Sequence, residues 1–232
     1  MEKPVTIDAR YCGPPESANG GYAAGVVAEG VDGVATVTLR IPPPLDTSML
    51  LRGDGASSAL MLGDELVGEA TASELDLEVP NPPSLAEAIA ASERYVFKEG
   101  NHLYPTCFVC GTDRRDDGLH IFPGSVAGSD LVAAPWIPDA SLGAGTGPID
   151  VRHVWSALDC PSYFGLGTTP MALLGRLTAA IDRVPTVGEQ LIAMGWPIGT
   201  DGRKLYSGSA LATVDGEILA KAAATWIELR AD

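Results

Sequence analysis

One pattern occurs twice in this sequence, and the repeat constrains the fold more than any other feature. Residues 59–70 and 210–222 each contain an apolar segment, a turn with Gly and Asp, a Glu and a second apolar segment. Upstream, residues 44–51 and 185–192 match as a further apolar segment that leads to a Gly-Asp turn. Each half of the chain is therefore expected to end in three antiparallel strands.

The turn residues indicate which hairpin each half uses. Gly63-Asp64 has Gly at the position where a type II′ turn needs a positive φ, and Asp215-Gly216 suits a type I′ turn. We therefore expect two tight hairpins at corresponding places in the two halves.

A helix and then a strand are expected before each set of three strands. In the first half, residues 19–28 contain small residues after a candidate N-cap, Ser17 or Asn19, and residues 35–41 alternate apolar and polar side chains. Small residues in the helix would allow a sheet to approach it closely. Each half then reads as one helix followed by about four strands.

The second half follows the same order. Residues 150–166 have apolar side chains at helical spacing, and residues 172–181 read as the following strand. Pro161 is expected to bend or end the helix, because proline lacks the backbone N–H that the helix needs.

A proline-rich break separates the halves at residues 80–83, and residues 84–97 predict an amphipathic helix. Ser84 and Glu87 have the spacing of a capping box. Beyond this helix we expect an opening loop, a strand over residues 119–123 and another over residues 131–136. The predicted organisation is an N-terminal unit, a linker and a C-terminal unit, at residues 1–79, 80–100 and 101–232.

Composition excludes several classes of partner. With 15 Lys and Arg against 30 Asp and Glu, the formal charge is −15, and no basic run attracts phosphate. We therefore expect no nucleic-acid and no membrane partner. The N-terminus has no apolar signal-peptide core, and four cysteines make no disulfide framework, so a cytoplasmic location is expected.

A long helix followed by antiparallel strands, twice in one chain, resembles the double hotdog fold of the thioesterase superfamily. Residues 19–24 (Asn-Gly-Gly-Tyr-Ala-Ala) look like the start of the central helix in acyl-CoA thioesterases, and residues 37–46 resemble the strand that follows it. Residues 156–159 (Ser-Ala-Leu-Asp) resemble the helix segment that carries the catalytic Asp in thioesterase II-type proteins. The resemblance implies an α+β fold in which two antiparallel sheets each wrap a central helix.

The resemblance also implies where a substrate would bind. The Gly20 and Gly21 amides at the start of a helix would hold the thioester oxygen, Asn19 would orient the thioester, and Tyr22 would belong to the same substrate-binding segment. Tight packing of the helix is the alternative reason for the two glycines.

Asp159 is the candidate general base or nucleophile, because a carboxylate on an otherwise apolar helix is partly desolvated. Ser207 and Thr225 are the candidates for holding the attacking water. A hydrogen bond from Asp159 to Ser156 or to a neighbouring turn is the structural alternative.

Two departures from the thioesterase II pattern leave a second hypothesis open. A Gln expected near the end of the last strand is replaced by residues 222–226, where Thr225 is the only polar side chain, and Ser207 stands at a Thr position. An acyl-CoA or acyl-carrier thioesterase is the favoured function, and a non-catalytic protein that binds acyl groups or acyl-CoA is the alternative. The chain would supply both hotdog units, as a monomer or as part of a homodimer.

Cys107 and Cys110 form a Cys-x-x-Cys-Gly motif, which with its downstream Gly-Leu resembles a subgroup of hotdog proteins. A zinc site would need Cys160, Cys12, His120 or His153 to converge on this pair. We interpret the motif as a structural turn with reduced thiols rather than as a metal site or a redox pair. No metal and no cofactor are expected.

Overall fold

The computed structural model describes residues 1–97, 101–168 and 170–229. The first half contains β1 (Glu2–Thr6), η1 (Ala9–Tyr11), α1 (Gly20–Ala28), β2 (Ala35–Leu39), β3 (Ser48–Gly53), β4 (Ser57–Leu62) and β5 (Glu65–Ala72), and α2 (Leu85–Ser92) follows. The second half contains β6 (Gly124–Ser125), β7 (Val132–Trp136), η2 (Ala140–Leu142), α3 (Val151–Phe164), β8 (Ala172–Ile181), β9 (Leu191–Asp201), β10 (Lys204–Thr213) and β11 (Ile218–Glu228). The chain is thus α+β, with a helix followed by four strands in each half.

All the described strands belong to one antiparallel sheet, in the order β1-β3-β4-β5-β2-β8-β11-β10-β9-β7-β6. The expectation of two separate sheets is wrong, because β2 and β8 pair across the halves, with Thr36 opposite Thr178. Their hydroxyl oxygens are 2.8 Å apart. An unpaired strand edge exposes backbone N–H and C=O groups, and this pairing removes one such edge from each half.

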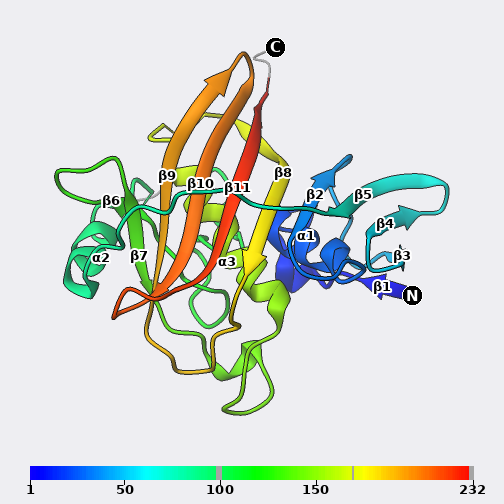
Figure 1. Ribbon diagram of the computed structural model, residues 1–232, viewed down its shortest axis with the longest axis horizontal. Helices are drawn as coiled ribbons and strands as arrows, with labels where there is room; N and C mark the ends of the chain where they lie inside the picture. The colour runs from blue at the N-terminus through cyan, green and yellow to red at the C-terminus, as the bar shows by residue number, and fades with distance from the viewer. Residues whose placement is uncertain (98–100, 169, 230–232) are drawn as a thin grey trace.

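The central helices α1 and α3 pack against each other on one face of the sheet (Figure 1). Gly21 and Gly25, one turn apart on α1, allow this close approach. A Cβ on Gly21 would lie 2.5 Å from the Trp155 carbonyl oxygen, and one on Gly25 would lie 2.9 Å from Arg152 Cα. The small residues of α1 therefore serve the contact with α3.

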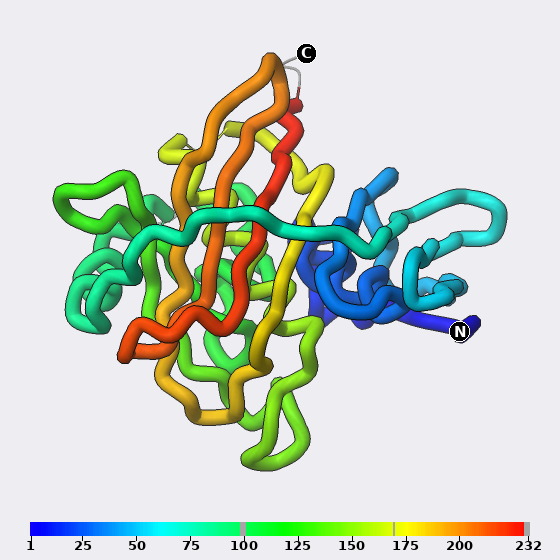
Figure 2. Tube along the Cα trace, in the orientation of Figure 1, coloured from blue at the N-terminus to red at the C-terminus, as the bar shows by residue number. Residues whose placement is uncertain are grey.

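A long extended segment, residues 73–84, crosses the opposite face of the sheet and leads to α2 (Figures 1 and 2). Lys221 Nζ donates a hydrogen bond of 2.9 Å to the Leu77 carbonyl oxygen where the segment passes β11. Ala88 and Ala91 of α2 then pack in a second apolar cluster with Met194 and other residues of β7, β9 and β10. The linker thus lies on the face of the sheet opposite the central helices.

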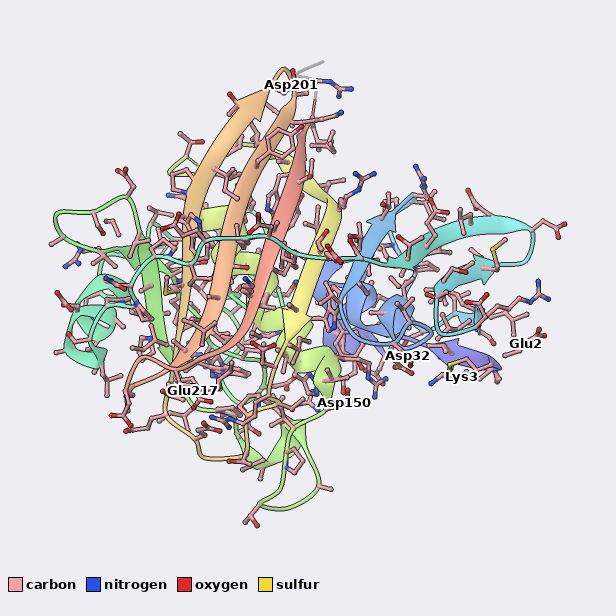
Figure 3. The ribbon with its side chains drawn as sticks, in the orientation of Figure 1. Glu2, Lys3, Asp32, Asp150, Asp201 and Glu217 are labelled. Atoms are coloured by element: carbon pink, nitrogen blue, oxygen red, sulfur yellow. The ribbon has the colours of Figure 1, made fainter. Side chains whose placement is uncertain are left out.

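The charged side chains that Figure 3 labels lie at the periphery, on the edge strand β1, at strand or helix ends, and, for Asp32, in the loop between α1 and β2. No helix in the described part of the chain is long and apolar enough to cross a membrane.

Several local predictions are confirmed. Asn19 caps α1, Ser84 and Glu87 form a capping box, and Gly63 has a positive φ of 58°.

Pro161 was expected to bend or end the second helix. It does not end α3, which continues to Phe164.

Other local predictions differ from the structure. The turn at Asp215-Gly216 is not type I′, because a type I′ turn needs a positive φ at both central residues and Asp215 has a negative one. This turn spans the four residues between β10 and β11, and among them only Gly216 takes a positive φ, 89°. The linker helix ends at Ser92 rather than at residue 97, and residues 119–123 are not a strand. β1 is a strand that the sequence analysis missed.

Replacing Gly25 with Ala tests the close contact of the helices. The added methyl group would overlap Arg152 and Trp155, which we expect to lower the free energy of unfolding by about 1–2 kcal/mol, a penalty that the better helix propensity of Ala offsets only in part. Gly199→Ala is the matched control, because nothing lies within 4 Å of its added Cβ. Urea unfolding should separate the two variants, and equal stability would contradict the packing argument.

Candidate functional site

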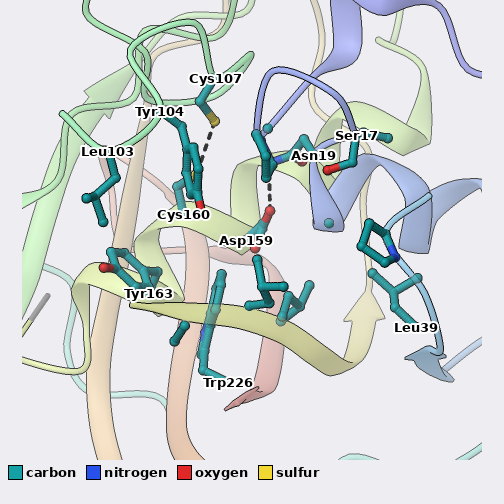
Figure 4. A pocket seen from close by; sticks show the side chains of 18 of the residues that line it. Ser17, Asn19, Leu39, Leu103, Tyr104, Cys107, Asp159, Cys160, Tyr163 and Trp226 are labelled. Atoms are coloured by element: carbon teal, nitrogen blue, oxygen red, sulfur yellow. Dashed lines mark hydrogen bonds between the residues drawn. The ribbon is translucent and has the colours of Figure 1, made fainter. Parts of the chain in front are cut away.

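A buried carboxylate joins the two halves at their central helices. Asp159 lies on α3 and is 2% exposed. Its Oδ2 accepts hydrogen bonds from Asn19 Nδ2 at 2.6 Å (Figure 4) and from the Gly21 backbone N–H at 2.9 Å. Asn19 also caps α1, since its Oδ1 accepts from the Tyr22 backbone N–H at 2.9 Å. The start of α1 is thus built around the carboxylate of the other half.

This contact differs from the structural alternative considered for Asp159. Ser156 does not bond Asp159; its hydroxyl donates to the Arg152 carbonyl oxygen at 2.9 Å. A Cβ on Gly21 would lie 2.6 Å from Asp159 Cβ, so a side chain there would displace the carboxylate. The motifs at residues 19–24 and 156–159 meet at this one point.

The second oxygen of Asp159 has no hydrogen-bond partner within the described part of the chain. Oδ1 is buried and makes no hydrogen bond to any described residue. Burial raises the pKa of Asp159 to about 7, and the hydrogen bonds from Gly21 and Asn19 lower it only in part. Buried acceptors are nearly always satisfied in proteins, so an unpaired buried carboxylate oxygen needs a specific explanation, such as a catalytic role or an ordered water.

A cavity of about 600 Å³ lies beside Asp159. Both halves and the segment that precedes β6 line it, mostly with apolar side chains such as Leu39, Leu103, Leu174 and Trp226. The charged or titratable side chains among its described lining residues are those of Glu16, Arg40, His102 and Asp159, the three cysteines Cys107, Cys110 and Cys160, and the tyrosines Tyr104 and Tyr163. The cavity therefore suits an apolar group that ends next to a carboxylate.

Three of the predicted site residues, Asn19, Gly20 and Asp159, line this cavity. The N–H of Gly21 is engaged by Asp159, whereas that of Gly20 makes no hydrogen bond to the described residues. Tyr22 does not line the cavity. Its ring stacks on Tyr11, with centroids 3.9 Å apart.

The structure does not bring Ser207 and Thr225 to the cavity. Ser207 is fully buried on β10, two residues from Ser209, whose hydroxyl donates to the Leu158 carbonyl oxygen at 2.7 Å. Strand alternation therefore places Ser207 beneath α3. Thr225 alternates with the buried Ala224 and Trp226 and so faces the other side of the sheet.

Cys160, the residue after Asp159, meets the Cys-x-x-Cys pair. The sulfur atoms of Cys107, Cys110 and Cys160 all lie within 4.8 Å of one another, and all three residues are buried and line the cavity. The pKa of the Cys107 thiol is lowered well below its usual value, because the Cys110 and Cys160 thiols and nearby backbone N–H groups donate to its sulfur. Of the four residues that could complete a zinc site with Cys107 and Cys110, Cys160 is the one that lies beside them in the described structure.

Much of the cavity wall was not predicted from the sequence. Tyr104, Tyr163 and Trp226 line it, and so do Pro42 and Pro43 after β2. No local pattern marks these residues, because they come together only through the pairing of the halves.

His153 lies on α3 outside the cavity, within 6 Å of the rings of Tyr11, Tyr22 and Phe108. Its Nδ1 has no partner in the described part of the chain. Burial lowers its pKa to about 4. The charged groups that act on this pKa are Asp150, Arg152, Arg10 and Asp139.

Comparison with solved structures identifies the fold. A conserved protein of unknown function from Alicyclobacillus acidocaldarius, described as having a hotdog fold, aligns over 100% of this chain and 94% of its own, with a TM-score of 0.66 and 14% identity. The fold is that of hotdog proteins.

Two further hotdog-like neighbours carry thioesterase names. A protein from Thermobifida fusca YX, named provisionally as a thioesterase II, aligns over 99% of this chain and 94% of its own, with a TM-score of 0.65 and 15% identity. An acyl-CoA thioesterase II from Mycobacterium marinum aligns over 100% of this chain and 94% of its own, with a TM-score of 0.59 and 10% identity. No family model matches the chain, and no curated protein sequence matches it.

His153 should make stability depend on pH. The unfolded chain takes up a proton near pH 6.5, whereas the folded chain does so only near pH 4. Lowering the pH from 7 to 4 should therefore cost the wild type about 3 kcal/mol of unfolding free energy from this residue. His153→Phe removes the titrating group, so denaturant unfolding at several pH values should show a smaller loss for the variant. Parallel stability curves for the two proteins would contradict the assignment.

Proposed function

We propose that the protein hydrolyses an acyl thioester, with Asp159 as the catalytic carboxylate. The observation that carries the proposal is the unpaired Oδ1 of a buried carboxylate at the wall of an apolar cavity. Asn19 and Gly21 hold the other oxygen, which fixes the orientation of Oδ1. The thioesterase names of several proteins with the same fold support this reaction class.

The proposed reaction uses Oδ1 as a general base. Oδ1 takes a proton from a water molecule as the water oxygen bonds to the thioester carbonyl carbon. The C–S bond then breaks, and the proton held by Oδ1 passes to the departing sulfur, which releases a carboxylic acid and a thiol and restores the carboxylate. The Gly20 N–H is the donor for the developing oxyanion, because the Gly21 N–H is already bonded to Asp159. This revises the initial assignment of both amides to the oxyanion. Direct attack by Oδ1 on the carbonyl carbon uses the same geometry.

The substrate would place its acyl chain in the cavity. Acyl-CoA and acyl-carrier proteins both present such a chain, and both carry phosphate at the far end of the pantetheine arm from the thioester. Among the residues that the structure describes, the cavity wall has one arginine, Arg40, and its guanidinium is paired with Glu69. The phosphate-bearing part would therefore lie outside the cavity.

We further infer that each half is one hotdog unit, residues 1–79 and 101–232, joined by residues 80–100. The repeated order of one helix followed by four strands supports this division. The site would then lie between the units, because Asn19 comes from the first and Asp159 from the second.

A non-catalytic acyl-binding protein is the second candidate. The observation that favours it is the placement of Ser207 and Thr225 outside the cavity, which leaves Asp159 without the two hydroxyl groups that the sequence assigned to holding a water. Acyl-CoA would then stabilise the fold against heat without being hydrolysed.

Asp159→Asn separates the two candidates. With acyl-CoAs from acetyl to palmitoyl and a thiol reagent as readout, the wild type should release CoA, and the variant should lose about 100-fold or more in kcat/KM. Asp215→Asn makes the same chemical change in an exposed turn and should keep the wild-type rate. Circular dichroism checks that each variant is folded.

The outcomes divide as follows. Hydrolysis at full rate by folded Asp159→Asn would refute the assigned base. No turnover of any chain length, together with a higher melting temperature in the presence of acyl-CoA, would favour the binding protein. Ser207→Ala and Thr225→Ala test the sequence-based assignment and should change kcat/KM by less than about tenfold.

A further inference from the structure

The three cysteines beside the cavity come from two distant parts of the chain. Cys107 and Cys110 lie on one turn, and Cys160 lies on α3, 53 residues after Cys107. Their sulfur atoms lie within 4.8 Å of one another, and the Sγ atoms of Cys107 and Cys160 are 3.9 Å apart. Three thiols that meet in this way need an explanation beyond a turn.

The spacing fits a tetrahedral thiolate site. Zinc binds cysteine sulfur at about 2.3 Å, which places two sulfurs of a tetrahedron about 3.8 Å apart. A disulfide joins only two sulfurs, at about 2.05 Å, and would leave the third cysteine of this group alone. The arrangement of three sulfurs therefore suits a shared metal ion better than a redox pair.

The segment around Cys107 is irregular. Residues 93–97 and 101–123, between α2 and β6, contain no helix or strand in their described part. A long irregular segment inside a compact domain is uncommon. Even so, Phe108 and Val109, between the two cysteines, are fully buried. A metal ion would fasten this segment to α3.

We propose that Cys107, Cys110 and Cys160 bind one thiophilic divalent cation, with Zn²⁺ as the expected ion. Each thiol that becomes a ligand loses its proton to solvent. Three thiolates leave one tetrahedral position, and water fills it from the cavity that all three cysteines line. His102 also lines the cavity but is not a ligand, because its Nε2 lies 2.8 Å from the Tyr95 hydroxyl and its Nδ1 accepts from the Tyr104 N–H.

Metal content and cobalt binding test the proposal without an activity assay. Protein purified without chelator should contain about one zinc per chain by elemental analysis. After zinc is removed under reducing conditions, added Co²⁺ should give the thiolate charge-transfer band and the strong visible bands of a tetrahedral site. Cys160→Ser should lose these bands.

Cys12→Ser is the matched control. Cys12 is also buried, but its sulfur lies against Thr106 and is not part of the three-sulfur group. This variant should therefore keep the cobalt bands and the zinc content.

The wild-type spectrum decides the proposal even if Cys160→Ser fails to fold. Absence of zinc in the wild type, together with no charge-transfer band after Co²⁺ is added to reduced protein, would overturn it. So would a disulfide between two of these cysteines in the native protein, found by mass spectrometry after alkylation without reductant. A finding that the protein does not hydrolyse thioesters would leave the proposal of a metal site standing, because these readouts do not use a substrate.

Discussion

The carboxylate of Asp159, buried at the start of α1, is the interaction on which the arrangement of the two halves depends. A charge in an apolar interior is costly unless hydrogen bonds compensate it. Asn19 Nδ2 and the Gly21 N–H supply two such bonds, at the positive end of the helix dipole. The same bonds hold α1 against α3, so the fold and the candidate site share one set of contacts.

This bridge has two consequences for chemistry. Oδ2 accepts the hydrogen bonds from Asn19 and Gly21, whereas Oδ1 has no partner among the described residues and belongs to a side chain that lines an apolar cavity. It also engages the Gly21 amide, which leaves Gly20 as the free donor at the helix start. A glycine pair that looks like two equivalent oxyanion donors in the sequence therefore divides into one structural and one open amide.

The parts of the fold that depend on local pattern could be predicted from the sequence. The Asn19 cap, the capping box at Ser84 and the turn at Gly63 follow from residue types at fixed spacing, and the resemblance of residues 19–24 and 156–159 to thioesterase motifs identified the two segments that meet. Pairing of β2 with β8 could not be predicted, since either strand is a plausible edge of its own half. The meeting of Cys160 with Cys107 depends on the same long-range packing, and so does the exclusion of Thr225 from the cavity.

A crystal structure with an S-alkyl-CoA thioether, which cannot be hydrolysed, would show directly whether Asp159 and the start of α1 form an acyl thioester site. We expect the alkyl chain in the cavity between Leu39 and Trp226, the sulfur near Asp159 Oδ1, and the phosphates outside. An alkyl chain bound elsewhere while this cavity stays empty would contradict the claim that Asp159 and the start of α1 form an acyl thioester site.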